Sequence, residues 1–226
     1  MNAYILHNRL GSGGFVIEAA LTLAGLDFDY TPLTSVADTA IASLVEDLNP
    51  WGQVPILMTP QGDTLSEVAA MIIWLAQNEP ACRQGPNLWV EDQAAFMRWS
   101  VFLAVNVYEG ILRDSYPQRF IDLDSLATVS HDDATLALRH AADKRVHAAL
   151  RVIEKQLRTR TFLLGTKLSM CDLFLAMLYA WHNEKPDLPN CTRITQGVAQ
   201  HPVVAPIWDR NFSHRLDKNW LKAAAT

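Results

Sequence analysis

The chain has 226 residues, of which 50% are hydrophobic and 19% charged, a composition that supports a buried core and excludes a disordered tail or solvated scaffold. The net charge of −5 argues against nucleic acid as the main partner. We find no apolar run of the roughly 18–20 residues that a membrane span needs, no signal-peptide pattern, and three widely spaced cysteines that fit reduced thiols in a cytoplasmic protein.

The first part of the chain predicts alternating strands and helices. Residues 4–6 are aromatic and β-branched and predict a strand, after which the sequence becomes rich in glycine. Residues 15–24 are apolar nearly all round and end at Gly25, a residue typical of helix C-termini. Residues 28–30 predict a second strand. This order is that of a parallel strand pair joined by a helical crossover.

A hairpin and another helix are predicted next. Residues 54–58 and 64–65 favour two strands on either side of a Pro-Gln-Gly turn. A helix is predicted from Ser66, as its N-cap, to Gln77. We therefore expect an α/β domain with a mixed four-stranded sheet over residues 1–78.

Beyond this point the pattern becomes helical. Residues 79–87 are rich in proline and glycine and predict a linker. Residues 94–112 predict a long aromatic-rich helix, and residues 132–157 carry one apolar stripe at helical spacing. Residues 173–181 are apolar on every face and predict a buried central helix. The expected second domain, residues 88–226, is therefore all-α.

The two expected domains differ in charge. Residues 1–78 hold one basic side chain, Arg9, against eight acidic ones, which is a net charge of −7. The remainder holds 18 basic and 16 acidic side chains, a net charge of +2. Either this bias serves no purpose, or an anion bound by the acidic domain needs cations supplied from elsewhere.

Three segments carry a resemblance to a known family. They are Asn49–Leu57 (N-P-W-G-Q-V-P-I-L), Leu65–Leu75 (L-S-E-V-A-A-M-I-I-W-L) and Phe162–Asp172 (F-L-L-G-T-K-L-S-M-C-D). They are similar to the N-P-x-G-x-V-P-x-L, L-x-E-S-x-A-I-x-x-Y-L and f-l-l-G-x-x-l-S-x-x-D patterns of glutathione transferases. Each pattern is weak alone, but three in the same order across nearly the whole chain resemble the family strongly.

The resemblance implies a thioredoxin-like first domain and an all-helical second domain, in a member closest to bacterial serine-type transferases. It implies that a cis bond precedes Pro55, which opens the third strand. It further implies that the backbone of Val54 pairs with the peptide backbone of glutathione. Gln53, Glu67 and Val68 then belong to the same glutathione site.

Family members lower the pKa of the glutathione thiol, which is about 8.5 when free, with a hydroxyl donor beside a helix N-terminus. Ser12 is the candidate for this role, although it could merely cap a helix that starts near Gly14. The window lacks a cysteine and an S-S-C-S-x-x-R run, which disfavours the thiol-transferring and isomerase types. Tyr4 fits a sheet residue better, and His7 and Asn8 are possible orienting groups.

Two departures from the family pattern concern the carboxylates of glutathione. Val68 replaces the serine whose hydroxyl and backbone N–H bind the γ-glutamyl carboxylate in the family. No Lys, Arg or His occurs between Leu10 and Cys82, so Arg9, the helical domain or a partner subunit would have to hold the glycyl carboxylate. The sequence therefore predicts weak glutathione binding, about millimolar, that tightens as salt screens the repulsion from the acidic domain.

The second-substrate pocket is expected around Phe15 and the long helix that carries Trp99, Phe102 and Tyr108, although such aromatic residues are often core.

For two further groups of residues we expect neither a catalytic role nor a metal site. Ser169 and Asp172 predict a structural capping box at the start of the buried helix. His140 and His147 share a helix face, but the sequence shows no further ligand beside them, so no metal is expected.

The predicted function is conjugation of glutathione to an electrophilic apolar small molecule, a detoxification reaction, by a homodimer without nucleic-acid or membrane partners. The alternative is a non-catalytic interaction module of the same fold with weak or no glutathione binding. A glutathione-dependent thiol reductase or isomerase is disfavoured because the catalytic window holds no cysteine.

Overall fold

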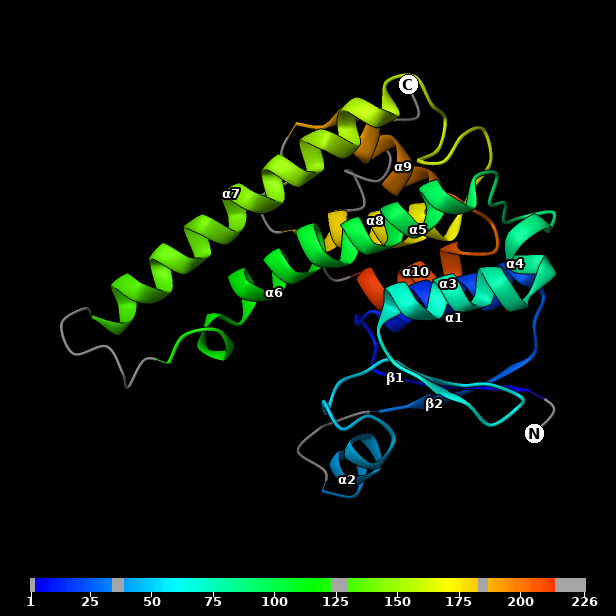
Figure 1. Ribbon diagram of the computed structural model, residues 1–226, viewed down its shortest axis with the longest axis horizontal. Helices are drawn as coiled ribbons and strands as arrows, with labels where there is room; N and C mark the ends of the chain where they lie inside the picture. Colours follow the sequence, from blue (N-terminus) through cyan, green and yellow to red (C-terminus); the bar gives the residue numbers. More distant parts are fainter. Residues whose placement is uncertain (1–2, 34–38, 123–129, 183–186, 214–226) are drawn as a thin grey trace.

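The computed structural model describes residues 3–33, 39–122, 130–182 and 187–213. A small mixed sheet lies at one end of the molecule, and most of the helices stack on one of its faces (Figure 1). The strands are β1 (Tyr4–Asn8), β2 (Phe28–Pro32), β3 (Ile56–Met58) and β4 (Thr64–Leu65). The predicted α/β domain with a mixed four-stranded sheet is thereby confirmed.

The strands are ordered β2-β1-β3-β4. β1 pairs in parallel with β2 and antiparallel with β3, which in turn pairs antiparallel with β4. α1 (Gly14–Ala24) makes the crossover from β1 to β2 and ends at Gly25, whose φ of 68° is the left-handed conformation that glycine adopts easily. The predicted strand, helix and strand therefore occur in the predicted order, with β1 two residues longer.

The two faces of the sheet are covered differently. Leu6 belongs to the core that β1 shares with α1, whereas Ile56 packs in a small cluster with Val45 of α2 (Thr39–Leu48). Because side chains alternate across a strand, His7, which pairs with Ile56, also faces the α2 side. No sequence pattern had predicted α2.

The helices that follow the sheet form the larger part of the molecule. They are α3 (Val68–Asn78), α4 (Pro80–Gln84), α5 (Gln93–Phe102), the π-helix η1 (Leu103–Tyr108), α6 (Glu109–Ser115), the 3-10 helix η2 (Pro117–Arg119), α7 (His131–Leu157), α8 (Met170–Trp181), α9 (Pro189–Gln200) and α10 (Ala205–Phe212). The predicted helix at residues 94–112 corresponds to α5, η1 and α6 in succession. The expected linker, residues 79–87, contains α4.

The start of α3 corrects one prediction. The helix begins at Val68, with Glu67 rather than Ser66 as the N-cap residue and with no side-chain cap. Glu67 has a φ of 66°, a left-handed conformation that is uncommon for a residue with a side chain. The chain therefore enters α3 through a sharp backbone turn instead of through a serine cap.

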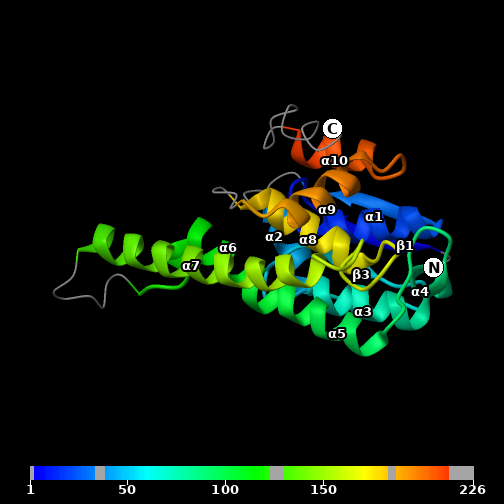
Figure 2. The same cartoon turned by 90° about the horizontal axis from the view of Figure 1, so that it is seen from above.

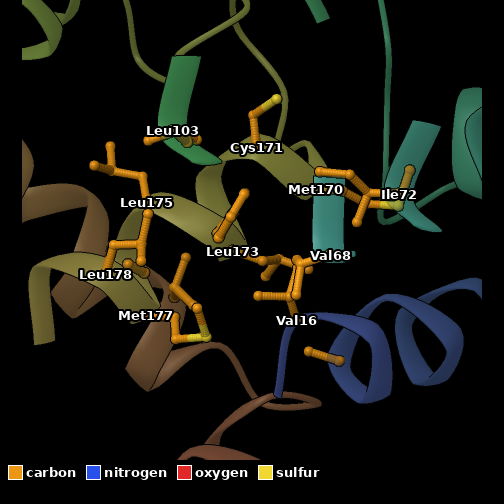
Figure 3. Close-up of a cluster of buried hydrophobic side chains, with 14 of the residues drawn as sticks. Val16, Val68, Ile72, Leu103, Met170, Cys171, Leu173, Leu175, Met177 and Leu178 are labelled. Carbon is orange, nitrogen blue, oxygen red and sulfur yellow. The ribbon is translucent and has the colours of Figure 1, made fainter. Parts of the chain in front are cut away.

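The core is continuous from the sheet to the last described helix. Every residue of α8 is buried, as predicted for its apolar segment, and its side chains meet Val16, Val68, Ile72 and Leu103 from α1, α3 and η1 (Figure 3). None of the described helices has the length and apolarity that a membrane span requires.

The predicted capping box at the start of α8 is present. The Asp172 carboxylate accepts hydrogen bonds from the Ser169 backbone N–H at 2.9 Å and from its hydroxyl at 2.6 Å. The other Asp172 oxygen accepts from Leu163 N–H at 2.8 Å. These bonds satisfy buried donors at the helix start, a structural role that needs no ligand.

Candidate active site

A cleft of about 540 Å³ separates the end of the sheet from the helices. Its sheet wall consists of Arg9, Leu10, Gly11, Ser12, Leu33, Gly52, Gln53 and Val54. Its helical wall consists of Tyr108, Ile111, Leu112, Ser115, Tyr116, Arg119 and Trp181. The two walls come from segments about a hundred residues apart in the chain, so only the fold brings them together.

Ser12 lies on the sheet wall between the end of β1 and the start of α1. Its hydroxyl donates a hydrogen bond to Oδ1 of Asn8 and accepts one from Gly14 N–H at 3.3 Å. Asn8 is fully buried, packs against the Cα of Gly14, and its Nδ2 lies 3.5 Å from the Tyr30 hydroxyl. A buried amide therefore fixes the position of the Ser12 hydroxyl.

The loop that carries Ser12 is anchored to the last described helix. Gly11 N–H donates a hydrogen bond of 2.9 Å to Oδ1 of Asn211, which is fully buried on α10. Gly11 has a φ of 73°, which residues with a Cβ adopt at a cost in free energy. α10 packs on α1, as seen from above in Figure 2. No local sequence pattern predicts a contact between residues so far apart in the chain.

The loop before β3 forms the other part of the sheet wall. The peptide bond between Val54 and Pro55 is cis, as predicted. Asn49 supports the loop, since its Nδ2 donates to the Gln53 carbonyl at 2.8 Å and its Oδ1 accepts from Trp51 N–H at 3.2 Å. Pairing of β1 with β3 begins only at Ile56, so the backbone groups of Val54 lie outside that ladder.

The starts of α1 and α3 meet beside Ser12. A Cβ placed on Gly13 would lie 2.7 Å from Cγ2 of Val68 and 3.3 Å from Cδ of Pro55. Val68 is 3% exposed and neither it nor the exposed Glu67 lines the cleft itself. Two helix N-termini, each carrying partial positive charge, therefore converge at one point next to the sheet wall.

Tyr108 faces this point from the helical wall. Its hydroxyl lies 3.6 Å from the position of a Cβ on Gly13, and its ring lies 5.4 Å from that of Trp181. Burial raises the pKa of Tyr108 to about 12, and the nearby Glu67 carboxylate adds to the rise. Tyr108 therefore stays protonated at neutral pH and is available as a hydrogen-bond donor. It ends the π-helix η1, a type of segment frequent at functional sites.

Two exposed arginines lie on opposite walls of the cleft. Arg9 belongs to the sheet wall, and Arg119 lies on η2, where its guanidinium stacks 4.4 Å from the ring of Tyr116. Both guanidinium groups oppose the rise in the pKa of Tyr108, so both act on the same part of the cleft. The sequence offered Arg9 as a cation for an anionic ligand, but it could not identify Arg119.

Matches to family models cover both parts of the chain. The N-terminal domain of glutathione S-transferase matches residues 16–78, and its C-terminal domain matches residues 120–196. The glutathione S-transferase-like protein LUC7 of a Fusarium species is 30% identical over 167 residues, which cover 74% of this chain and 71% of that protein. The chain belongs to the glutathione S-transferase family.

Other relatives of this glutathione S-transferase family member are similar over nearly its full length. The GST-like protein YncG of Escherichia coli K12 is 24% identical over 206 residues, covering 89% of this chain and 95% of YncG. A glutathione transferase homologue from Sulfitobacter, solved with bound glutathione, has a TM-score of 0.74 at 18% identity, covering 94% of this chain and all of that one. The second likeness concerns the fold alone.

Three residues expected in the second-substrate pocket of the transferase lie elsewhere. Phe15 is fully buried and packs edge-on against Trp208 and Phe212 of α10 at ring distances of 5.4 and 4.9 Å. Trp99 is buried in the core, where Phe102 packs against it at 5.2 Å. These aromatic side chains fill the interior, and of the four expected pocket residues Tyr108 is the one that lines the cleft.

Two other candidates also lie away from the cleft. Tyr4 is buried beneath α3, where its hydroxyl bonds to Glu79 and its ring packs against Trp74. His7 is 8% exposed on the α2 face, and burial lowers its pKa. Of the possible orienting groups, Asn8 is therefore the one in contact with Ser12.

Proposed function

We propose that the protein conjugates glutathione to an electrophilic, apolar small molecule. The observation that carries this proposal is the placement of Ser12, a hydroxyl held by a buried amide beside two helix N-termini, on one wall of an aromatic cleft. Such a point favours an anion, and a thiolate is the anion that conjugation requires.

Ser12 would stabilise the thiolate by donating its hydroxyl proton to the sulfur. In the observed arrangement this proton is directed to Asn8 Oδ1. Turning the Asn8 amide by 180° makes its Nδ2 the donor to Ser12 and leaves its oxygen toward Tyr30, so the Ser12 hydroxyl becomes free to donate to sulfur. We propose that Asn8 adopts this orientation when glutathione is bound.

In the reaction, the glutathione thiol loses its proton to solvent and its sulfur attacks the electrophilic carbon of the second substrate. A sulfur–carbon bond forms, and the electron pair of the broken bond goes to the leaving group or to an adjacent electron-accepting atom. The Tyr108 hydroxyl is a donor for the negative charge that develops there, because it stays protonated and faces the cleft. Ile111, Leu112 and Trp181 offer the apolar surface.

The charges of the cleft lead us to propose a salt dependence of glutathione binding opposite to the one expected from the sequence. The acidic first domain repels an anion from many directions, but charges farther away than about 10 Å are largely screened at 0.1 M salt. Arg9 and Arg119 line the cleft itself and act at short range. We propose that they hold the glycyl carboxylate and that added salt weakens binding.

Titration calorimetry with glutathione and a conjugation assay with an activated aryl chloride test the proposal together. Saturable binding and formation of the thioether would support it. Binding without turnover, for the aryl chloride and for a panel of epoxides and unsaturated carbonyls, would contradict catalysis. It would favour the interaction module, a second candidate supported by Val68 in place of the carboxylate-binding serine.

We also propose that two copies form a homodimer. Met97, Val101 and Val105 are 38%, 50% and 55% exposed and recur every fourth residue along α5 and η1, so they form an apolar stripe on the surface. The opposite net charges of the two parts of the chain suit a pairing of unlike domains. Light scattering at micromolar concentration should give twice the chain mass of 25.3 kDa, and the monomer mass would overturn this proposal.

A further inference from the structure

A cluster of three side chains that can bind a metal, one aspartate and two histidines, lies outside the cleft, where α7 meets the end of α8. Asp143 and His147 are four residues apart on α7, so they project from the same helix face. His182 directly follows the last residue of α8. The sequence suggested only His140 as a second metal ligand beside His147, whereas the fold brings a carboxylate and a second imidazole close to it.

The distances within the cluster match those of a tetrahedral metal site. Oδ1 of Asp143 lies 3.4 Å from Nε2 of His147 and 3.5 Å from Nε2 of His182. Zinc–ligand distances of about 2.0–2.2 Å place neighbouring ligand atoms about 3.3–3.6 Å apart in a tetrahedron. One ligand atom from each residue lies within 4.8 Å of the other two, so the third edge, between the two imidazoles, is also short enough for one ion to be shared.

The surroundings hold these side chains in place while leaving an open position. His182 is 5% exposed, and its ring packs edge-on against that of His147 at 4.9 Å. The side chains of Asp143 and His147 are 31% and 24% exposed, so solvent reaches one side of the cluster. Such access suits a metal with three protein ligands and a water.

We propose that Asp143, His147 and His182 bind one divalent transition-metal ion, and zinc suits this donor set best. Imidazole nitrogens and one carboxylate favour zinc over magnesium or calcium, which prefer oxygen ligands. The carboxylate also neutralises half of the cation's charge at a partly buried position.

The site joins α7 to the end of the helix that completes the cleft. His182 follows Trp181, which lines the helical wall and packs against Tyr108. A bound ion therefore adds a cross-link between α7 and α8 behind this wall. The ion also raises the free energy of unfolding, by an amount that increases with its affinity and its free concentration.

Zinc binding to tag-free protein, stripped with a chelator and titrated against a chromophoric zinc indicator, tests the site. We expect one zinc per chain. Asp143→Asn and His182→Gln should each weaken zinc binding about 10-fold or more, because loss of a residue that only supports a metal ligand already costs about that much, and these substitutions remove a ligand itself. The wild type should also unfold at a higher temperature with zinc than without it. Circular dichroism of each variant checks that it is folded.

His131→Ala is the matched control, because His131 is an exposed histidine on the same helix, about 18 Å from Asp143 along its axis. It should leave zinc affinity unchanged. All three cysteines are buried, so thiols do not compete in the folded protein. Cobalt as a probe should give the visible absorption of a tetrahedral site in the wild type and lose it in His182→Gln. No binding, or equal affinity in His131→Ala and His182→Gln, would overturn the proposal.

Discussion

The two walls of the cleft are built in different ways. The sheet wall positions backbone groups and the Ser12 hydroxyl through a loop fixed by Asn8 and Asn211, a loop fixed by Asn49, and two helix N-termini. The helical wall positions side chains, among them the Tyr108 hydroxyl and the Arg119 guanidinium. We propose that the sheet wall sets the kind of ligand that binds, whereas the helical wall supplies one of the two cleft arginines and apolar surface around the ligand.

The largest effect is expected from Ser12 on the sheet wall. If its hydroxyl stabilises the thiolate, Ser12→Ala should lower turnover with an activated aryl chloride about 10²-fold or more, since the loss of a comparable hydrogen-bond donor is worth about 2.7–4 kcal/mol. Ser115→Ala, which removes a hydroxyl from the helical wall, should change turnover far less. Equal effects of the two substitutions would remove the proposed distinction between the walls.

A smaller effect is expected from the helical wall through Arg119. Arg119→Ala should weaken glutathione binding by about one to two decades, because a hydrogen bond to a charged group contributes about 1.5–3 kcal/mol. Arg113→Ala is the control, since Arg113 pairs with Glu109 and does not line the cleft. Calorimetry at two salt concentrations should show that added salt weakens glutathione binding more in the wild type than in Arg119→Ala. If added salt tightens glutathione binding to the wild type instead, repulsion from the acidic domain dominates over attraction to the arginines.

The smallest effect concerns Val68, behind the sheet wall. Val68→Ser should tighten glutathione binding several-fold, because it adds a hydroxyl at a helix N-terminus whose N–H groups already favour a carboxylate. The buried position makes the change destabilising, by about 1–3 kcal/mol. Val68→Ala removes similar packing without adding a hydroxyl, so it should share the loss of stability but not the gain in affinity. Equal affinity in both variants would exclude the hydroxyl as the cause.

The same contrast explains what the sequence could predict. The sheet wall depends on short segments, such as Asn49 to Pro55, whose residues contact one another locally, so a linear pattern identifies them. The capping box of Ser169 and Asp172 is local in the same sense, and it too was predicted correctly.

The helical wall depends on which face of a long helix turns toward the sheet. Trp99 and Tyr108 lie on one predicted helix, but in the structure Trp99 is buried in the core whereas Tyr108, the last residue of the π-helix η1, lines the cleft. Periodicity within the segment does not tell which helix face lines the cleft, and it does not place Arg119 on the wall opposite Arg9. Ser66 was wrong as the N-cap because the backbone turn at Glu67 places the N-cap one residue later.

The bond between Gly11 and Asn211 has a consequence for how the protein is made. The two residues are 200 positions apart, and Glu18 of α1 likewise pairs with Arg210 of α10. A ribosome synthesises the Ser12 loop about 200 residues before Asn211, so the nascent chain lacks this bond until α10 has been made. We therefore expect the proposed glutathione site to be complete only after α10 has docked on α1, and a chain that lacks α10 should bind glutathione more weakly.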